Sequence, residues 1–141
     1  MKIDYDSNIT DYKTLVDIFL RTIDVTDPGG QFCDRGRSYE TAIHAFTPEE
    51  TALAEQAVAE GEAYLGQTIV TPVEGEVTFW IAEEYHQNYY KSEELRLTRF
   101  GALTRAQAYL QYRKACGRDA RVKQLWGDEA YTGVSHAQKG A

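Results

Sequence analysis

The chain has 141 residues, of which 43% are hydrophobic and 12% aromatic, so it is long enough for one globular domain with a buried core and too short for two. Its formal net charge is −7, and no run of Lys and Arg is dense enough for a nucleic-acid footprint, which argues against DNA, RNA and anionic membranes as partners. The opening MKIDYDSNITDYK lacks the features of a secretory signal, and no apolar run approaches membrane-spanning length. These features predict a soluble, cytoplasmic protein.

Four segments have the composition or the alternation of β-strands. Residues 3–5 and 39–46 alternate apolar with polar side chains. Residues 68–73 and 77–81 are rich in β-branched and aromatic side chains and are separated by Glu-Gly-Glu. We expect short strands at all four.

Helices are predicted between and after these segments. The apolar positions of residues 12–23 recur at helical spacing, with Thr10 or Asp11 as the N-cap, and the pattern stops before the Pro-Gly-Gly turn that begins at residue 28. Thr47 and Pro48 open a second helix that should reach about Tyr64. Further helices are expected at 83–90, 104–115 and 118–126, with Gly117 between the last two. The sequence therefore predicts one α/β domain over residues 1–131, followed by a flexible tail over residues 132–141.

The chain contains two cysteines, Cys33 and Cys116, and three scattered histidines. Because the cysteines lie far apart in an apparently intracellular chain, we expect reduced thiols rather than a structural disulfide. The single histidines give no zinc-ligand spacing, so we expect no metal and no bound cofactor.

Three stretches in order resemble a known family: DPGGQFCDRGRSYETAI at 27–43, FWIAEEYHQNYY at 79–90 and YRKACGRDARVKQLWGDEA at 112–130. Together they resemble the peptide-methionine sulfoxide reductase A family, whose members reduce the S epimer of methionine sulfoxide. The resemblance covers nearly the whole chain. It implies a two-layer α/β sandwich on a ferredoxin-like core with a mixed sheet, and a role in repairing oxidised methionine under oxidative stress.

Family members also carry an earlier part, with Gly-Cys-Phe-Trp, Gly-Tyr-x-Gly-Gly and Gly-His-Ala-Glu motifs, and none of these motifs occurs here. In the family this part holds the nucleophilic cysteine, the aromatic methyl pocket and the glutamate that protonates the sulfoxide oxygen. We therefore expect a truncated, C-terminal portion of the family domain that lacks the first strand of the sheet and is inactive alone. A missing strand leaves backbone groups unpaired, which predicts a homodimer, a complementing chain or a rearranged edge.

The resemblance assigns roles to two residues of the loop at 27–43. Asp34 and Tyr39 match the family's Asp and Tyr at the same spacing, and both help to hold the sulfoxide oxygen or a nearby water. A fixed phenol donor suits this task because the oxygen gains basicity and then a proton as sulfur is attacked.

The two cysteines have alternative interpretations. Cys33 could substitute as nucleophile, but the neighbouring Asp34 would raise its thiol pKa while Arg35 and Arg37 act in the opposite direction, and we favour a small loop residue. Cys116 could be a resolving thiol, as near the C-terminus of many relatives, or a semi-buried thiol in a turn. An active protein would form a disulfide that thioredoxin or another thiol reduces.

Two other groups of polar residues suggest structural roles. His86 lies beside Glu83 and Glu84, which suggests acid–base chemistry, but we favour a histidine that fixes the fold by hydrogen bonds. The charges of residues 118–123 are interpreted as a solvated helix face with local ion pairs.

Two functions remain open. The first is a methionine sulfoxide reductase whose catalytic-cysteine segment lies outside these residues, acting on methionine sulfoxide in proteins or free. The second is a non-catalytic, degenerate relative that binds oxidised methionine or a protein partner, or is only a stable remnant.

Overall fold

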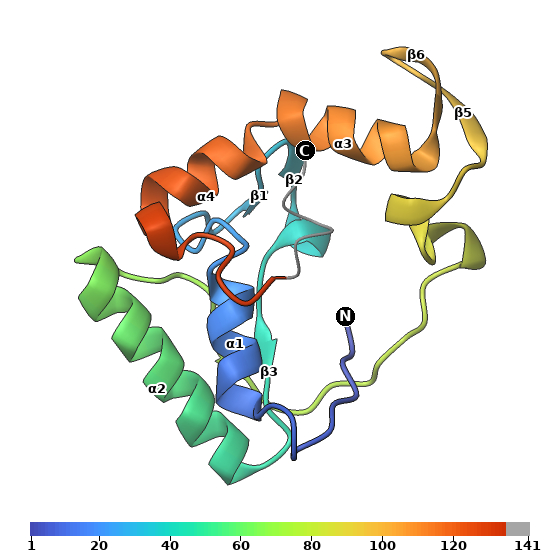
Figure 1. Cartoon of the computed structure of the whole chain (residues 1–141). Helices are drawn as coiled ribbons and strands as arrows, with labels where there is room; N and C mark the ends of the chain where they lie inside the picture. Colours follow the sequence, from blue (N-terminus) through green and yellow to red (C-terminus); the bar gives the residue numbers. More distant parts are fainter. Residues whose placement is uncertain (135–141) are drawn as a thin grey trace.

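The computed structural model describes residues 1–134 and shows a mixed α/β fold, as the sequence predicts (Figure 1). The described residues form four α-helices and six short strands, which pair into three two-stranded ladders, together with four 3-10 turns. The helices are α1 (Tyr12–Leu20), α2 (Pro48–Leu65), α3 (Arg105–Ala115) and α4 (Arg118–Trp126). The strands are β1 (Gly30–Gln31), β2 (Asp34–Arg35), β3 (Ile43–His44), β4 (Val73–Glu74), β5 (Leu95–Thr98) and β6 (Gly101–Thr104).

The caps of α1 and α2 are those that the sequence predicts. The Asp11 carboxylate accepts a hydrogen bond from the Thr14 amide at 2.8 Å, and the Thr47 hydroxyl accepts one from the Glu50 amide at 3.1 Å. Each bond satisfies an amide that the first helical turn would leave unpaired. Helix α2 ends at Gly66 in the left-handed conformation, with φ 66°.

Strands β3 and β4 run parallel, with Ile43 opposite Val73 and His44 opposite Glu74. Helix α2 connects them, so residues 43–74 form a β-α-β unit. The Val70 amide donates to the Val25 carbonyl at 2.8 Å, which places the segment after α1 beside this unit.

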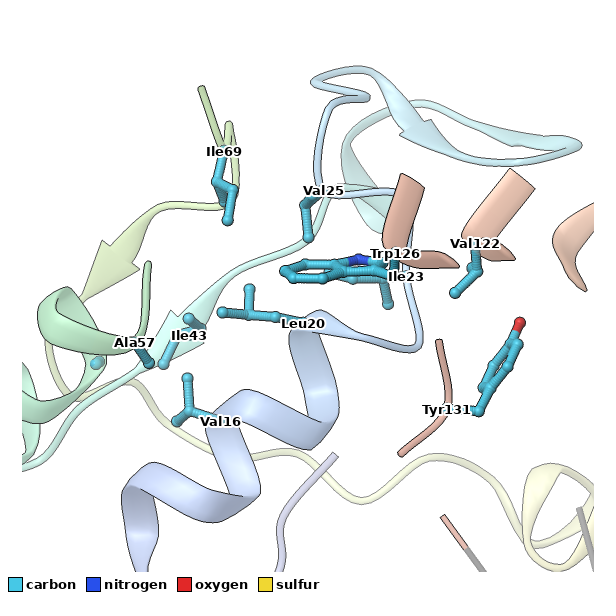
Figure 2. Packing of buried hydrophobic residues seen from close by; sticks show 11 residues of the cluster. Val16, Leu20, Ile23, Val25, Ile43, Ala57, Ile69, Val122, Trp126 and Tyr131 are labelled. Carbon is cyan, nitrogen blue, oxygen red and sulfur yellow. The ribbon is translucent and has the colours of Figure 1, made fainter. Parts of the chain in front are cut away.

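The core lies where α1, α2 and α4 meet (Figure 1). Figure 2 shows the Trp126 indole among Leu20, Ile23 and Val25, with Val16 of α1 and Ile43 of β3 further away. The buried cluster comprises Val16, Leu20, Ile23, Val25, Ile43, Ala54, Ala57, Ile69, Val122, Trp126 and Tyr131. Gly61 brings α2 close to this cluster, because a Cβ there would lie 2.8 Å from the Ile69 Cδ1 and 3.2 Å from the Trp126 ring.

Helices α3 and α4 follow one another across the same end of the molecule, and the β5–β6 hairpin lies at the far end of α3 (Figure 1). A capping box of Thr104 and Gln107 starts α3. Gly117 separates the helices with φ 67°, as expected.

Several predicted elements are wrong or shorter than expected. Residues 3–5 and 77–81 form no strand, and the predicted strands at 39–46 and 68–73 are reduced to β3 and β4. The first two segments are largely exposed, and no neighbouring strand among residues 1–134 pairs with them. Isolated extended segments have no ladder to stabilise them, whatever their β-propensity.

The helix predicted at 83–90 is also wrong. Two 3-10 turns, η2 (Glu84–His86) and η3 (Tyr89–Lys91), replace it, and Asn88 between them has φ 55°, which interrupts a right-handed helix. The sequence did not predict the β5–β6 hairpin. The tail expected at 132–141 lies mostly outside the described residues.

Candidate active site

The candidate site is built on a hairpin loop, residues 27–41, that carries Asp34 and Tyr39. Gly30 pairs with Arg35 and Gln31 with Asp34 across a two-residue turn. Gly30 has φ 148°, and a Cβ there would lie 2.2 Å from the Asp34 carbonyl oxygen, so only glycine fits.

Asp27 links the two strands of the hairpin loop through hydrogen bonds to Gly29 before β1 and to Arg35 in β2. Its carboxylate accepts a hydrogen bond from the Gly29 amide at 3.0 Å and pairs with both terminal nitrogens of the Arg35 guanidinium. The hydrogen bond from Arg35 holds the pKa of the Asp27 carboxyl below its ordinary value.

Asp34 and Tyr39 both face solvent. Asp34 lies in β2, and Tyr39 ends the 3-10 turn η1 (Arg37–Tyr39), whose backbone is closed by a hydrogen bond from the Tyr39 amide to the Gly36 carbonyl. The Tyr39 side chain is 50% exposed. Within residues 1–134 neither the Asp34 carboxylate nor the Tyr39 hydroxyl has a hydrogen-bond partner, so both can bind an external polar group.

Two depressions lie near the loop and near α3. The first, about 380 Å³, lies beside the hairpin loop and is lined by Asp27, Arg37, Glu40, His44 and Glu74, among others, but not by Asp34 or Tyr39. The second, about 450 Å³, is lined by Tyr85, Tyr89, Arg96, Leu97, Thr98, Arg105 and Tyr112. Neither depression brings the two predicted oxygen-binding residues together.

Cys33 and Cys116 form a disulfide, with their Cα atoms 5.3 Å apart. The expectation of two reduced thiols is therefore wrong. The tip of the hairpin loop meets the turn between α3 and α4, so a sequence separation of 83 residues becomes a direct contact. The disulfide also means that Cys33 and Cys116 are not thiols in this state.

The base of the hairpin loop is held to α4 by a buried polar cluster. The Gln31 side chain accepts from the Asp24 amide at 2.9 Å and donates to the Asp24 carbonyl at 2.8 Å. The Asp24 carboxylate accepts from the Arg121 Nε at 2.7 Å, and a second Arg121 nitrogen donates to Thr26. Burial alone would raise the pKa of the Asp24 carboxyl, but the hydrogen bonds from Arg121 and Thr26 keep it below its ordinary value. We call Asp24, Thr26, Gln31 and Arg121 the base cluster.

The interpretation of residues 118–123 as a solvated face is wrong for three of the charges. Arg121 belongs to the base cluster, and the Arg118 guanidinium lies 4.4 Å from the centre of the Phe32 ring. Asp119 accepts hydrogen bonds from Arg113 at 2.8 Å and from the Tyr131 hydroxyl at 2.7 Å. Sequence reasoning missed the contacts of Arg118 and Arg121 because their partners, in residues 24–32, lie in a distant segment of the chain.

His86 lies outside this arrangement. It is exposed in η2, with Nε2 4.0 Å from a Glu83 carboxylate oxygen and its ring 4.2 Å from the Tyr85 ring. Its neighbour Gln87 donates to the Ala82 carbonyl at 2.9 Å. These contacts are all local, and His86 does not approach the hairpin loop.

Among residues 1–134 no group of His, Cys, Asp and Glu side chains is arranged to hold a metal ion. The described helices also include none that is both long enough and apolar enough to cross a membrane.

Comparison with known proteins identifies the class. The model of the peptide methionine sulfoxide reductase family matches residues 1–129. The chain belongs to this family.

Individual relatives agree with the match. The chain is 44% identical over 136 residues to peptide methionine sulfoxide reductase MsrA 2 of Rhizobium meliloti (strain 1021), which covers 96% of the chain and 63% of the relative. It is 40% identical over 128 residues to the MsrA 2 protein of Caulobacter vibrioides, covering 90% of the chain and 59% of the relative. It is 31% identical to MsrA 2 of Staphylococcus aureus (strain MW2), covering 92% of the chain and 67% of the relative. The chain thus spans about three fifths of the first two relatives.

Proposed function

We propose that this chain is the oxygen-binding portion of a peptide-methionine (S)-S-oxide reductase. It acts with a segment that carries Gly-Cys-Phe-Trp, in the same polypeptide or in a second one. Asp34 and Tyr39 hold the sulfoxide oxygen or a water beside it. The observation that carries the proposal is the hairpin loop, which is fixed to the rest of the molecule while the Asp34 and Tyr39 side chains have no internal partner within residues 1–134.

The chemistry requires a thiolate that attacks the sulfoxide sulfur and a hydrogen-bond donor that binds the sulfoxide oxygen. The thiolate attacks the sulfoxide sulfur, the sulfoxide is reduced to a thioether, and the thiol is oxidised to a sulfenic acid. A second thiol then condenses with the sulfenic acid to give a disulfide and water, and thioredoxin or another thiol reduces that disulfide. The Tyr39 hydroxyl donates to the oxygen as its basicity rises, which stabilises the charge that develops there.

The open edges of a two-stranded ladder and a group of exposed apolar side chains support the proposal that a further segment binds to this chain. The β3–β4 ladder has only two strands within the described residues. Large apolar side chains are exposed in residues 77–100: Val77, Phe79, Trp80, Ile81, Tyr85, Tyr90, Leu95, Leu97 and Phe100. A strand added beside the β-α-β unit would complete a mixed sheet, which is the proposed two-layer, ferredoxin-like arrangement of residues 1–131.

A second function has its own supporting observation. Both cysteines are joined in the disulfide, so the described state offers no thiolate to attack a sulfoxide. The chain alone would then bind oxidised methionine, or a protein that contains it, without reducing it.

The two functions are separated by a reductase assay with dithiothreitol as the reductant. The chain is assayed with methionine S-sulfoxide, alone and after addition of a family segment that carries Gly-Cys-Phe-Trp, and the R epimer serves as the control substrate. We expect turnover of the S epimer only when the segment is present. Absence of turnover in both conditions, with measurable binding of the S epimer, would favour the binding function.

A further inference from the structure

We propose that the depression beside α3 is a binding site for one carboxylate group of an acidic peptide, held by the guanidinium groups of Arg96 and Arg105. We call this depression the α3 pocket. It has a volume of about 450 Å³ and is lined by Tyr85, Tyr89, Arg96, Leu97, Thr98, Arg105 and Tyr112. The proposal stands on the side chains of this pocket and does not depend on the proposed reductase function.

The two arginines of the α3 pocket share one carboxylate of the protein. Glu94 pairs through Oε2 with the Arg105 Nη2 at 2.8 Å and through Oε1 with the Arg96 Nη2 at 3.1 Å. Two guanidinium charges therefore face one carboxylate charge, and none of the lining residues named above is acidic. The pocket has an excess of one positive charge, which a single external carboxylate would neutralise.

Arg105 is buried and has too few hydrogen-bond acceptors around it. Its side chain is only 8% exposed. Nη1 donates to the Tyr85 carbonyl at 3.3 Å and Nη2 pairs with Glu94, but Nε has no hydrogen-bond partner within residues 1–134. A guanidinium has five N–H donors, so these two contacts leave donors for a further acceptor. A further acceptor would offset part of the free-energy cost of burying this charge.

Three tyrosines add donors and an apolar wall to the α3 pocket. The Tyr89 ring centre lies 5.8 Å from the Arg105 guanidinium. In the described part of the chain, the hydroxyls of Tyr85, Tyr89 and Tyr112 have no hydrogen-bond partner, so each is free to donate to a carboxylate oxygen. Their rings, together with Leu97, give an apolar surface on which the peptide next to the carboxylate would pack.

Backbone hydrogen bonds hold the α3 pocket in shape. Arg105 is the first residue of α3, and its amide donates to the Glu94 carbonyl while the Ala106 amide donates to the Ser92 carbonyl, both at 3.0 Å. These bonds fix Glu94 against the start of the helix, and β5, which contains Arg96, is paired with β6. Both guanidinium groups are therefore positioned before a ligand binds, which lowers the entropic cost of binding.

The segment around the α3 pocket is basic in an otherwise acidic chain. Residues 91–118 contain seven Lys and Arg residues and two Glu residues, whereas the net charge of the whole chain is −7. This contrast favours an acidic partner at this surface. A peptide fits better than a nucleic acid, because the pocket offers one unneutralised charge and not the row of cations that successive phosphates require.

The test is an NMR titration of the whole chain with short blocked peptides. Acetyl-Gly-Glu-Gly-amide supplies a side-chain carboxylate, acetyl-Gly-Gly-Gly with a free C-terminus supplies a terminal carboxylate, and acetyl-Gly-Gln-Gly-amide is the uncharged control. We expect at least one acidic peptide to shift the backbone amides of residues 85–89, 96–98 and 105–112 in a saturable manner, and the control to leave them unchanged. The acidic peptide that binds identifies the source of the carboxylate.

Several results of this titration would overturn the proposal. These are the absence of a saturable shift with both acidic peptides, and equal shifts with the glutamine peptide. Tighter binding of inorganic phosphate or of an oligothymidylate would also overturn it, because the pocket would then be a site for phosphate or for a nucleic acid.

Two variants separate the α3 pocket from the general charge of the basic segment. Arg96→Gln and Lys114→Gln each remove one positive charge from an exposed position, but only Arg96 lines the pocket. R96Q should weaken binding of the acidic peptide by about tenfold, because it removes a charge-assisted contact, and K114Q by less than about twofold. Equal losses in the two variants would overturn the assignment to the pocket. Arg105→Gln should also weaken binding by about tenfold or more, and if this variant fails to fold, the comparison of R96Q with K114Q still decides the case.

Discussion

The carboxylate of Asp24 accepts a 2.7 Å hydrogen bond from the Nε of Arg121, which joins residues 97 positions apart in the sequence. Asp24 is also bonded through its backbone to the Gln31 side chain at the base of the hairpin loop. Arg121 lies on α4, five residues before Trp126 of the core. The pair therefore connects the loop of the candidate site to the core through one ion pair.

Replacing Arg121 by Gln should lower the free energy of unfolding by about 1–2 kcal/mol, because it leaves a buried carboxylate with fewer hydrogen bonds while the lost guanidinium is itself partly exposed. The matched control is Lys123→Gln, an exposed cation on the same helix, which should change stability little. Urea unfolding measures both, and hydrogen exchange should show faster exchange in residues 27–36 for R121Q only. Equal stabilities of the two variants would contradict the role of the base cluster.

Replacing Gly30 by Ala should deform the hairpin loop. The added Cβ would meet the Asp34 carbonyl oxygen at 2.2 Å, and the backbone has φ 148°. We expect a loss of about 2–3 kcal/mol, in the range of locally strained backbone. Gly75→Ala is the control, since its Cβ would meet nothing within 4 Å and its φ is not positive in the left-handed range. Thermal unfolding measures the stability of both variants. A G30A variant as stable as G75A would contradict the close approach of Gly30 to Asp34.

Stability should fall in acid because of two carboxyls, that of Asp24, which is buried, and that of Asp119, which is partly buried. Burial would raise the pKa of Asp24 and of Asp119, but hydrogen bonds from Arg121 and Thr26 to the former, and from Arg113 and Tyr131 to the latter, lower each below its ordinary value. A lowered folded-state pKa contributes stability above the unfolded pKa of about 4, and that contribution is lost as the pH falls through the folded pKa. Urea unfolding from neutral to acidic pH should therefore show a plateau and then a decline. Asp24→Asn should be less stable at neutral pH and lose less on acidification, and an identical acid decline in both proteins would contradict this assignment.

The two tryptophans should report opposite environments. Trp80 is 82% exposed and Trp126 is 3% exposed. With Trp126→Phe, the remaining Trp80 should emit like tryptophan in water and be quenched by acrylamide, whereas Trp126 in the Trp80→Phe variant should emit at shorter wavelength and resist quenching. A protected Trp80 in the monomeric chain alone would contradict the exposed surface.

The sequence predicted four of its five expected helices, those that became α1 to α4, because their signals are local, whereas the helix expected at 83–90 does not form. Asp11, Thr47 and Thr104 cap helices through side chains that contact the backbone three residues away, and Gly66 and Gly117 end helices by their own conformation. These features depend on neighbours in the chain and not on the rest of the fold.

The strands and the cysteines could not be predicted in this way. A strand needs a partner, and residues 77–81 have β-rich composition but no partner strand within residues 1–134. The disulfide depends on whether the tip of the hairpin loop reaches the α3–α4 turn, which the base cluster and the Phe32–Arg118 contact determine. The prediction of reduced thiols considered only the cellular compartment and the distance between the cysteines in the sequence, and neither reveals that the loop tip contacts the α3–α4 turn. The resemblance gave Asp34 and Tyr39 a role, but their exposure and the fixed loop beneath them are visible only in the structure.

The central claim is that this chain supplies the groups that bind the sulfoxide oxygen, and the most direct measurement is kcat/KM for methionine S-sulfoxide with the Gly-Cys-Phe-Trp segment present. The variants are Tyr39→Phe, and Tyr90→Phe as a control that is also 50% exposed but lies outside the hairpin loop. We predict that Y39F lowers kcat/KM by roughly 10²-fold, as loss of one donor to a developing oxyanion does, whereas Y90F leaves it unchanged. Equal activity of Y39F, Y90F and the unmodified chain would contradict the claim.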